Sequence, residues 1–374
     1  MDKRKLLKGF EVELFTGTYH THIGISHEIE QVFSDFVKEP DNRNVEYITK
    51  PSKDYEILSK SLLNPRIRLR KWLKERGLTI IPSSTLCFEY DNNFQRSDLE
   101  NSYHEFIEES YGTSIATSSV HINLGIDNLE RLFAAIRLVR CEASLYLALS
   151  ASSPFINGKF SGNHSQRWVQ FPKTPLSVPF FENHTEYIDW IEDKINIGIM
   201  QNVRHFWSSI RPNGPQRPYK LDRLELRICD FVPDIRLLLA ITALLELRVI
   251  FLFENILETD PMISSEFKMN ELSEICDLNE LKAAKNSLNA ELIDWKNGKK
   301  IICSDWIKIM LNQVAPLAEE LGMKDQLKPI QKVLREGNQS MQWIKKYNGG
   351  ETVEDIMKEQ INKMLKTEQD ILNS

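Results

Sequence analysis

Four short stretches of the sequence place carboxylates, a histidine and arginines at alternate positions between apolar residues. The polar residues are Glu11 and Glu13 in the first stretch, Glu46 in the second, His121 and Asn123 in the third, and Arg223, Glu225 and Arg227 in the fourth. Alternate side chains of an extended strand point to opposite faces, so each stretch separates its polar groups from its apolar groups. Four such strands in one sheet would give that sheet a single polar face.

Carboxylates that converge on one face repel one another unless they are protonated or bound to cations. One more carboxylate, Glu39, lies in the turn just before the Glu46 strand. Oxygen-rich ligand sets favour hard cations such as Mg²⁺ or Mn²⁺, and protein-bound magnesium commonly shares its coordination with substrate phosphates. Arg223 and Arg227 lie on the same face as Glu225, and arginine beside a metal suits a phosphoryl group in transfer. The pattern predicts an ATP-dependent enzyme, although the chain contains neither GxxxxGK[ST] nor GxGxxG.

Each of these features also has a simpler interpretation. A lone alternating strand is more often a half-solvated strand than a ligand strand, and His121 by itself is more often a structural histidine. His20, His22 and His27 are interpreted as solvated loop residues, because histidines spaced i,i+2 in a loop fix no metal geometry. Cys229 is interpreted as a buried structural cysteine rather than a redox or substrate-contact thiol.

The composition of the 374 residues is that of a globular protein, with 41% hydrophobic and 27% charged residues. A net charge of −6 gives no reason to expect nucleic-acid binding, which normally requires a basic face. The five cysteines are scattered without CxxC spacing, which favours reduced thiols and a cytoplasmic location. The most apolar run, residues 237–253, carries Glu246 and Arg248, so it predicts a buried core helix and no membrane span.

The spacing of apolar residues indicates which elements hold the polar strands in place. Helices are predicted at 28–36, at 54–75 with a break near Pro65, and at 128–152. The basic residues Arg66, Arg68, Arg70, Lys71 and Lys74 are interpreted as a solvated helix face. Residues 158–179 and 207–219 lack clear periodicity and are predicted as loops that cover the site.

Composition changes after Pro233, which divides the chain into a sheet-bearing catalytic region, 1–232, and a helical region, 233–374. Helices are predicted at 234–257, 279–295, 304–321, 325–336 and 353–372, without any strand. We expect the helical region to pack on the catalytic region as one structural unit.

The polar strands and several loops together resemble the glutamate–cysteine ligases, in particular the cyanobacterial-type branch. The strand matches are residues 9–13 (GFEVE), 44–47 (NVEY), 119–123 (SVHIN) and 224–230 (LELRICD). Further matches are 149–154 (LSASSP), 164–168 (HSQRW), 207–214 (WSSIRPNG) and 335–338 (REGN). The resemblance runs from about residue 8 to about residue 343 and implies an α+β, glutamine synthetase-like fold. In that fold a curved, mainly antiparallel sheet holds a concave active site and is backed by helices.

The resemblance also implies an activity, the ATP-dependent ligation of L-cysteine to the γ-carboxylate of L-glutamate. It assigns one Mg²⁺ or Mn²⁺ to Glu13, Glu39 and Glu46, with Asp41 as the alternative to Glu39, and a second to Glu11, His121 and Glu225. Arg227 matches the arginine at the transferring phosphate of ATP, and Arg167 matches an arginine of the amino-acid pocket. Arg211 and Arg223 are further candidates for substrate binding.

The expected partners are small molecules only, with no nucleic acid and no membrane, and the expected state is a monomer or homodimer. Two alternatives stay open at this stage. A related carboxylate–amine ligase would use the same metal and ATP groups with a different amine. A non-catalytic scaffold would bind divalent ions through the same carboxylates for structural purposes.

Overall fold

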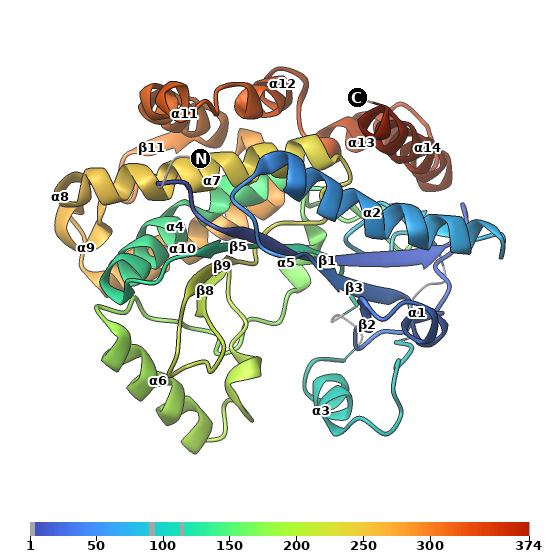
Figure 1. The fold of residues 1–374 in the computed structure, drawn as a ribbon, viewed down its shortest axis with the longest axis horizontal. Coiled ribbons are helices and arrows are strands. Elements are labelled where there is room, and N and C mark those ends of the chain that lie inside the picture. The colour runs from blue at the N-terminus through green and yellow to red at the C-terminus, as the bar shows by residue number, and fades with distance from the viewer. Residues whose placement is uncertain (1–3, 90–93, 113–115, 374) are drawn as a thin grey trace.

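Seven strands form one antiparallel sheet at the centre of the molecule (Figure 1). The computed structural model describes residues 4–89, 94–112 and 116–373. The strands are β1 (Lys8–Gly17), β2 (Phe36–Lys38), β3 (Asn44–Ile48), β4 (Thr79–Ile81), β5 (Val120–Gly125), β8 (Ile210–Asn213) and β9 (Arg223–Leu226). Their order is β2-β3-β1-β5-β9-β8, with β4 paired to the end of β1. The four polar-faced strands predicted from the sequence therefore share one sheet.

Helices cover the apolar face of this sheet. The long helices α2 (Tyr55–Lys74), α4 (Leu129–Ser150) and α7 (Ile235–Glu254) lie on that side, and α4 contacts β8 and β9. Phe10, Val12 and Leu14 of β1 are fully buried there. The shorter helices α3 (Ser102–Tyr111) and α6 (His184–Asn196) project from the opposite side (Figure 1). The polar face of the sheet thus lies between α3 and α6.

The predicted core helix at 237–253 is confirmed as α7, and its charged residues are paired. Glu246 accepts hydrogen bonds from Lys8 Nζ at 2.9 Å, from the backbone N–H of Leu6 at 2.7 Å and from the Tyr55 hydroxyl at 2.7 Å. Arg248 donates to Glu142 of α4 at 2.7 Å. Among the helices of the described residues, none is both long enough and apolar enough to cross a bilayer.

Two expectations about α2 were wrong. The helix continues through Pro65, because buried leucines on both sides of the proline hold it against the core. Its basic residues are also only partly solvated. Arg66 is fully buried and donates to the Tyr47 hydroxyl and the Pro233 carbonyl, and Arg70 is buried in an ion pair with Glu368. A buried guanidinium with acceptors at fixed positions joins elements that are far apart in sequence.

Two shorter segments near the N-terminus also differ from expectation. The helix predicted at 28–36 is α1 (Ser26–Val32), and Phe36 instead begins β2, where it is buried opposite Tyr47. His22 is buried between the rings of Phe15 and Phe88 rather than solvated. Burial against aromatic rings explains this position without any metal.

The C-terminal region is mainly helical but contains a hairpin that the sequence pattern did not predict. Its elements are α8 (Ile256–Thr259), α9 (Pro261–Ser264), α10 (Met269–Asn286), β10 (Glu291–Ile293), β11 (Lys300–Ile302), α11 (Cys303–Glu320), α12 (Lys328–Glu336), α13 (Gln339–Asn348) and α14 (Val353–Leu372). The helix predicted at 279–295 ends at Asn286, because Asn279 bonds both backbone groups of Ile293 and fixes β10 beside α10. The main hydrophobic cluster contains residues from both sides of Pro233.

Candidate active site

The register of the central sheet brings the predicted polar residues together. Glu13 lies opposite Glu46 across β1 and β3, and Glu11 lies opposite His121 across β1 and β5. They border a cavity of about 250 Å³ on the polar face. The other charged and aromatic residues that line this cavity include Glu39, Asp41, Tyr103, Arg167, Phe171, Arg204, Trp207, Arg211, Arg217 and Arg227.

The first carboxylate set is Glu13, Glu39 and Glu46, whose oxygens lie within 4.8 Å of one another. These are the three residues predicted for one metal. Asp41, the alternative to Glu39, is held in a buried ion pair with Arg43 at 2.7 Å and accepts from the backbone N–H of Gln95. Because its oxygens are occupied, the geometry favours Glu39.

No cationic side chain of the described residues forms an ion pair with Glu39 or Glu46, and both carboxyls have high pKa values. Burial, with the nearby Glu13, raises the pKa of Glu39 to about 8. Burial and the charge of Glu39 raise the pKa of Glu46 well above its ordinary range. Closely spaced carboxylate oxygens without a cationic side chain beside them are suitable ligands for a hard divalent cation, so the set fits Mg²⁺ or Mn²⁺.

A second set overlaps the first at Glu46. It contains Glu11, Glu46 and His121, again with ligand atoms within 4.8 Å, and His121 Nδ1 lies 3.0 Å from Glu11 Oε2. Glu225, which the resemblance assigned to this set, lies 3.7 Å from His121. Its carboxylate instead accepts from Arg211 at 2.8 and 3.1 Å and pairs with Arg227. The described geometry therefore groups Glu46 with Glu11 and His121, and the assignment of individual ligands stays a prediction.

The arginine pairs determine the charge state of Glu225. Burial alone would raise the pKa of this carboxyl, but Arg211 and Arg227 hold it well below the ordinary value. Arg227 reaches from Glu225 toward His121, with its Nη1 3.3 Å from His121 Nδ1. Arg227 thus stands beside His121 of the second set, and its contact with the transferring phosphate stays a prediction.

The other predicted arginines occupy different positions. Arg167 is buried, lines the cavity and donates to the carbonyls of Arg227 and Ile228, each at 3.1 Å, so it fixes the backbone that carries Arg227. Arg223 lies outside this cavity, in an adjoining one of about 300 Å³ that also contains Glu11. There its Nε donates to Asn123 at 3.1 Å. Cys229 is fully buried, as predicted, and burial raises the pKa of its thiol to about 12.

Several residues of the cavity were missed in the sequence, among them Tyr103, Arg204 and Arg217. Tyr103 comes from α3, Arg204 from the short 3₁₀ helix η2 (Val203–His205), and Arg217 from the hairpin loop between β8 and β9. The guanidinium of Arg204 lies 4.6 Å from the centre of the Tyr103 ring. These segments have no alternating pattern, and the only available signal was the presence of arginine and tyrosine in long polar connections.

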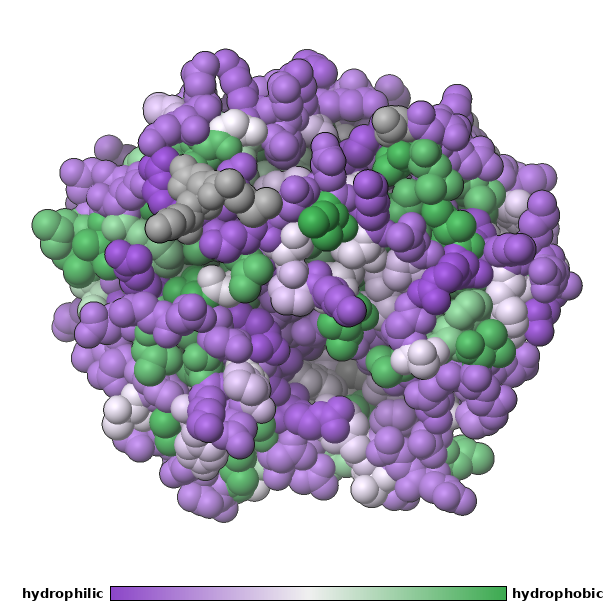
Figure 2. Space-filling view, in the orientation of Figure 1, coloured by the Kyte–Doolittle hydropathy of each residue, from purple (hydrophilic) through white to green (hydrophobic). Residues whose placement is uncertain are grey.

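The two segments predicted as covering loops are partly regular. Residues 158–179 contain β7 (Lys159–Phe160) and α5 (Gln166–Gln170), and residues 207–219 contain β8. They still contribute Phe171 and Trp207 to the cavity wall. Figure 2 shows a mostly hydrophilic face that is hollowed between the parts of the molecule that carry α6 and α3.

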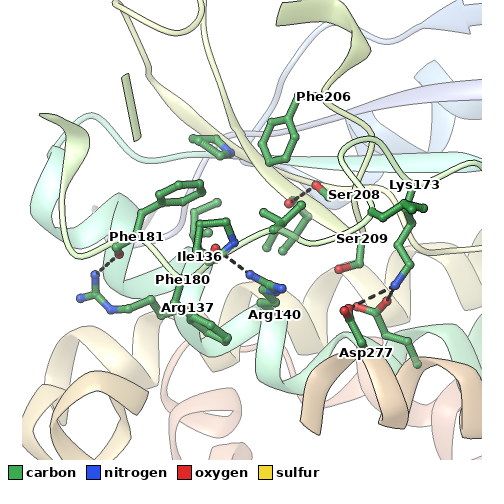
Figure 3. Close-up of a pocket in the computed structure, with 16 residues that line it drawn as sticks. Ile136, Arg137, Arg140, Lys173, Phe180, Phe181, Phe206, Ser208, Ser209 and Asp277 are labelled. Atoms are coloured by element: carbon green, nitrogen blue, oxygen red, sulfur yellow. Dashed lines mark hydrogen bonds and ion pairs between the residues drawn. The ribbon is translucent and has the colours of Figure 1, made fainter. Parts of the chain in front are cut away.

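A separate small cavity lies between α4, α10 and the segment before β8 (Figure 3). It has room for about one water molecule, with a volume of about 20 Å³. Its cations are bonded to protein acceptors. Arg140 donates to the Pro179 carbonyl at 2.7 Å, and Lys173 pairs with Asp277 at 3.1 Å. The protein itself thus engages these cations, whereas most of the predicted site residues line the larger cavity.

Comparison with known proteins agrees with this geometry. Residues 7–367 match the family model described as "Glutamate-cysteine ligase family 2(GCS2)". A Nocardia farcinica protein named "Putative glutamate--cysteine ligase 2-2" is 28% identical over 230 residues, which are 60% of this chain and 57% of that protein. A Mycolicibacterium smegmatis protein named "Putative glutamate--cysteine ligase 2-1" is 26% identical over 275 residues, 72% and 69% of the two chains. The chain thus spans less than two thirds of the length of some curated relatives that it matches.

Solved structures confirm the predicted α+β fold. A glutamate–cysteine ligase from Francisella tularensis in complex with AMP superposes with a TM-score of 0.72 at 14% identity, covering 99% of this chain and 90% of that one. A bifunctional glutathione synthetase from Pasteurella multocida gives 0.74 at 14% identity, covering 98% and 53%. The family match extends over nearly the whole sequence, so the chain belongs to the glutamate–cysteine ligase family 2.

Proposed function

We propose that this member of the glutamate–cysteine ligase family 2 uses ATP to join L-cysteine to the γ-carboxylate of L-glutamate, giving γ-glutamylcysteine, ADP and phosphate. The observation that carries the proposal is the pair of overlapping carboxylate sets beside Arg227 in one polar cavity. The names of the curated relatives support glutamate and cysteine as the substrates. We place the reaction in the cytoplasm, consistent with five cysteines that are all buried and form no disulfide within the described residues.

The acidic side of the cavity would hold the metal ions. Glu13, Glu39 and Glu46 would bind one Mg²⁺ or Mn²⁺, and Glu11 and His121 would bind a second together with Glu46 or Glu225. Bound there, the cations would neutralise the triphosphate of ATP and align it for transfer. Because Glu39 and Glu46 form no ion pair with a cationic side chain in the described part of the chain, metal binding would also relieve their repulsion.

The arginine side of the cavity would act on the transferring group. In-line transfer to the γ-carboxylate of glutamate makes an acyl phosphate, and negative charge spreads over the phosphoryl oxygens on the way. Arg227 would stabilise that charge, since Glu225 orients its guanidinium and Arg167 holds its backbone. The amine of cysteine then attacks the acyl carbon and phosphate leaves. Phe171 and Trp207 in the wall would keep water from the acyl phosphate.

The test is a coupled assay of ADP release by the purified chain with Mg²⁺, ATP and glutamate, with and without cysteine. We expect cysteine-dependent ADP release and a product with the mass of glutamate plus cysteine minus one water. Replacing cysteine with other amino acids in the same assay separates this activity from that of a ligase with a different amine. ADP release that no amine stimulates would contradict the proposal.

A further inference from the structure

We propose that Arg217 binds the α-carboxylate of an amino-acid substrate in the active-site cavity. This inference rests on the proposed function and assigns a role to a residue outside the alternating strands. The reaction consumes the γ-carboxylate of glutamate and the amine of cysteine. The α-carboxylates of both amino acids stay unreacted, and each needs a cationic partner in a buried site.

Arg217 differs from Arg167, Arg211 and Arg227 of the cavity in that its guanidinium has no hydrogen-bond or ion-pair partner among the described residues, while Arg204 contacts the Tyr103 ring. Its Nε and Nη1 are buried without a hydrogen-bond partner among the residues that the structure describes. Arg211 and Arg227, by contrast, bond to Glu225, and Arg167 bonds to two carbonyls. A buried donor without a partner costs about 1–3 kcal/mol, and native proteins seldom leave one unless water or a ligand takes the hydrogen bond.

The hairpin loop that carries Arg217 is held in place. A Cβ on Gly214 would lie 2.1 Å from the Lys220 carbonyl oxygen, so the two arms of the loop approach too closely for any other residue there. The loop is also fastened to α6. The Pro218 carbonyl lies 2.8 Å from His184 Nε2, and the Tyr219 hydroxyl donates to Glu192 at 2.8 Å. The backbone therefore presents Arg217 to the cavity at a fixed place.

The surroundings of Arg217 favour a carboxylate over the phosphates of ATP. Arg227 acts on the pKa values of Glu11, Glu39 and Glu46, so it faces the end of the cavity that would hold metal and triphosphate. Arg217 comes from the loop fastened to α6, and the groups that act on its pKa besides burial are Arg211, Tyr187, Glu225 and Arg227, none of which is a carboxylate of the two sets. Arg217 thus enters the cavity from a different part of the fold than the two carboxylate sets. Its planar fork of N–H donors matches a carboxylate in bidentate geometry.

The experiment compares Arg217→Gln and Arg217→Lys with Lys220→Gln, an exposed cation of the same loop that does not line the cavity. For each protein, kcat/KM with glutamate is compared with kcat/KM with 4-aminobutyrate, which is glutamate without its α-carboxylate. In the same way, kcat/KM with cysteine is compared with kcat/KM with cysteamine, which is cysteine without its carboxylate. For Arg217→Gln we expect one of these two preferences in kcat/KM to fall by about 10- to 100-fold.

The preference that falls identifies the substrate whose carboxylate Arg217 binds. Arg217→Lys should retain part of the preference, and Lys220→Gln should retain all of it. The inference is overturned if both preferences stay unchanged in Arg217→Gln, or if only the KM for ATP rises, which would indicate a phosphate contact.

A binding measurement separates this inference from the proposed function. Calorimetric titration with the same four compounds, in Mg²⁺ and a non-hydrolysable ATP analogue, requires no turnover. One outcome is that the wild-type chain shows no turnover but binds the carboxylate-bearing compounds better, and that Arg217→Gln loses this preference. That outcome would refute the ligase reaction and support the role of Arg217. A wild-type chain that binds neither amino acid better than its decarboxylated counterpart would overturn the role of Arg217.

Discussion

Buried charges in the helical layer and on the polar face of the sheet are arranged in opposite ways. Behind the sheet, two buried acids each have a base as partner: Glu246 pairs with Lys8, and Glu142 with Arg248. On the polar face, Glu13, Glu39 and Glu46 crowd together, and among the described residues only His121, 3.7 Å from Glu13, stands within ion-pair distance of any of the three. The first arrangement is complete as folded, whereas the repulsion in the second is relieved only when protons or bound cations neutralise the carboxylates.

This contrast separates residues that stabilise the fold from residues that act on a substrate. Removing one member of a compensated buried pair leaves an unpaired charge and destabilises the protein. Removing one member of an uncompensated cluster relieves repulsion, so the folded state should tolerate the change while metal binding suffers. The two kinds of site should therefore respond to mutation in opposite ways.

The largest effect is expected at Glu46, the residue shared by both carboxylate sets. Glu46→Ala should lower kcat/KM by about 10³-fold, because it removes a ligand from each set. The melting temperature of the metal-free protein should stay the same or rise. Steady-state kinetics with calorimetry checks both outcomes. Substantial turnover by this variant would favour the scaffold interpretation of the carboxylates.

The opposite result is expected at Glu246. Glu246→Ala leaves Lys8 buried without its partner and should lower the free energy of unfolding by about 3–5 kcal/mol. Denaturant titration measures the loss, and kcat of the remaining folded protein should be close to that of wild type. Glu254→Ala, which breaks a partly exposed pair with Arg4, is the control and should cost less than about 1 kcal/mol. Equal losses from the two variants would refute the contrast.

Arg227 shares features of both arrangements, because it forms a buried pair with Glu225 and also lies in the cavity with the carboxylate sets. Arg227→Ala should lower kcat by about 10²- to 10³-fold. The fold should persist, since Glu225 retains Arg211 and Asn213 as partners. Circular dichroism beside kinetics distinguishes this outcome from unfolding, and Arg236→Gln on the surface is the control. Loss of the folded spectrum would make Arg227 a structural arginine.

The smallest effect is a pH dependence of the metal-free protein. The pKa of Glu39 is about 8 in the folded chain against an ordinary 4.5, so the folded state binds this proton more tightly than the unfolded state. Its contribution to stability is full below pH 4.5 and is lost as pH rises through 8. The melting temperature in EDTA should fall between pH 5 and 9, and Glu39→Gln should reduce that fall.

Addition of Mg²⁺ provides the complementary measurement. Because the ionised carboxylates are the ligands, stabilisation by Mg²⁺ should be larger at pH 8 than at pH 5. At 100 times the dissociation constant it should reach about 2.7 kcal/mol. Glu46→Ala should lose most of this increase. A melting temperature that Mg²⁺ leaves unchanged at both pH values would contradict a metal site in this cavity.

The sequence was most informative where a pattern is periodic. Alternation around Glu11, Glu46 and His121 predicted strands that each have one polar face, and the apolar run containing Glu246 predicted a buried helix. That these strands share one sheet is an observation of the structure. Period two fixes the face of a side chain, but not its partner across the sheet. For that reason the proximity of Glu46 to both Glu11 and His121 could not be predicted.

The rest depended on tertiary contacts that leave no local pattern. The sequence pattern indicates a solvated helix residue at Arg66, but in the structure Arg66 donates to the Pro233 carbonyl, 167 positions away in the chain. The hairpin at β10 and β11 depends on the side chain of Asn279. Arg217 belongs to an irregular loop, and its position follows from the attachment of that loop to α6.

The pairing of β1 with both β3 and β5 also constrains how this gene can change. Insertion of a single residue between Gly9 and Glu11 would turn both glutamates of β1 toward the core and Val12 toward the cavity. Insertion of two residues would restore the face but shift each carboxylate away from its present neighbours. Substitutions can therefore be accepted one at a time along β1, whereas changes in its length should be almost absent among functional descendants.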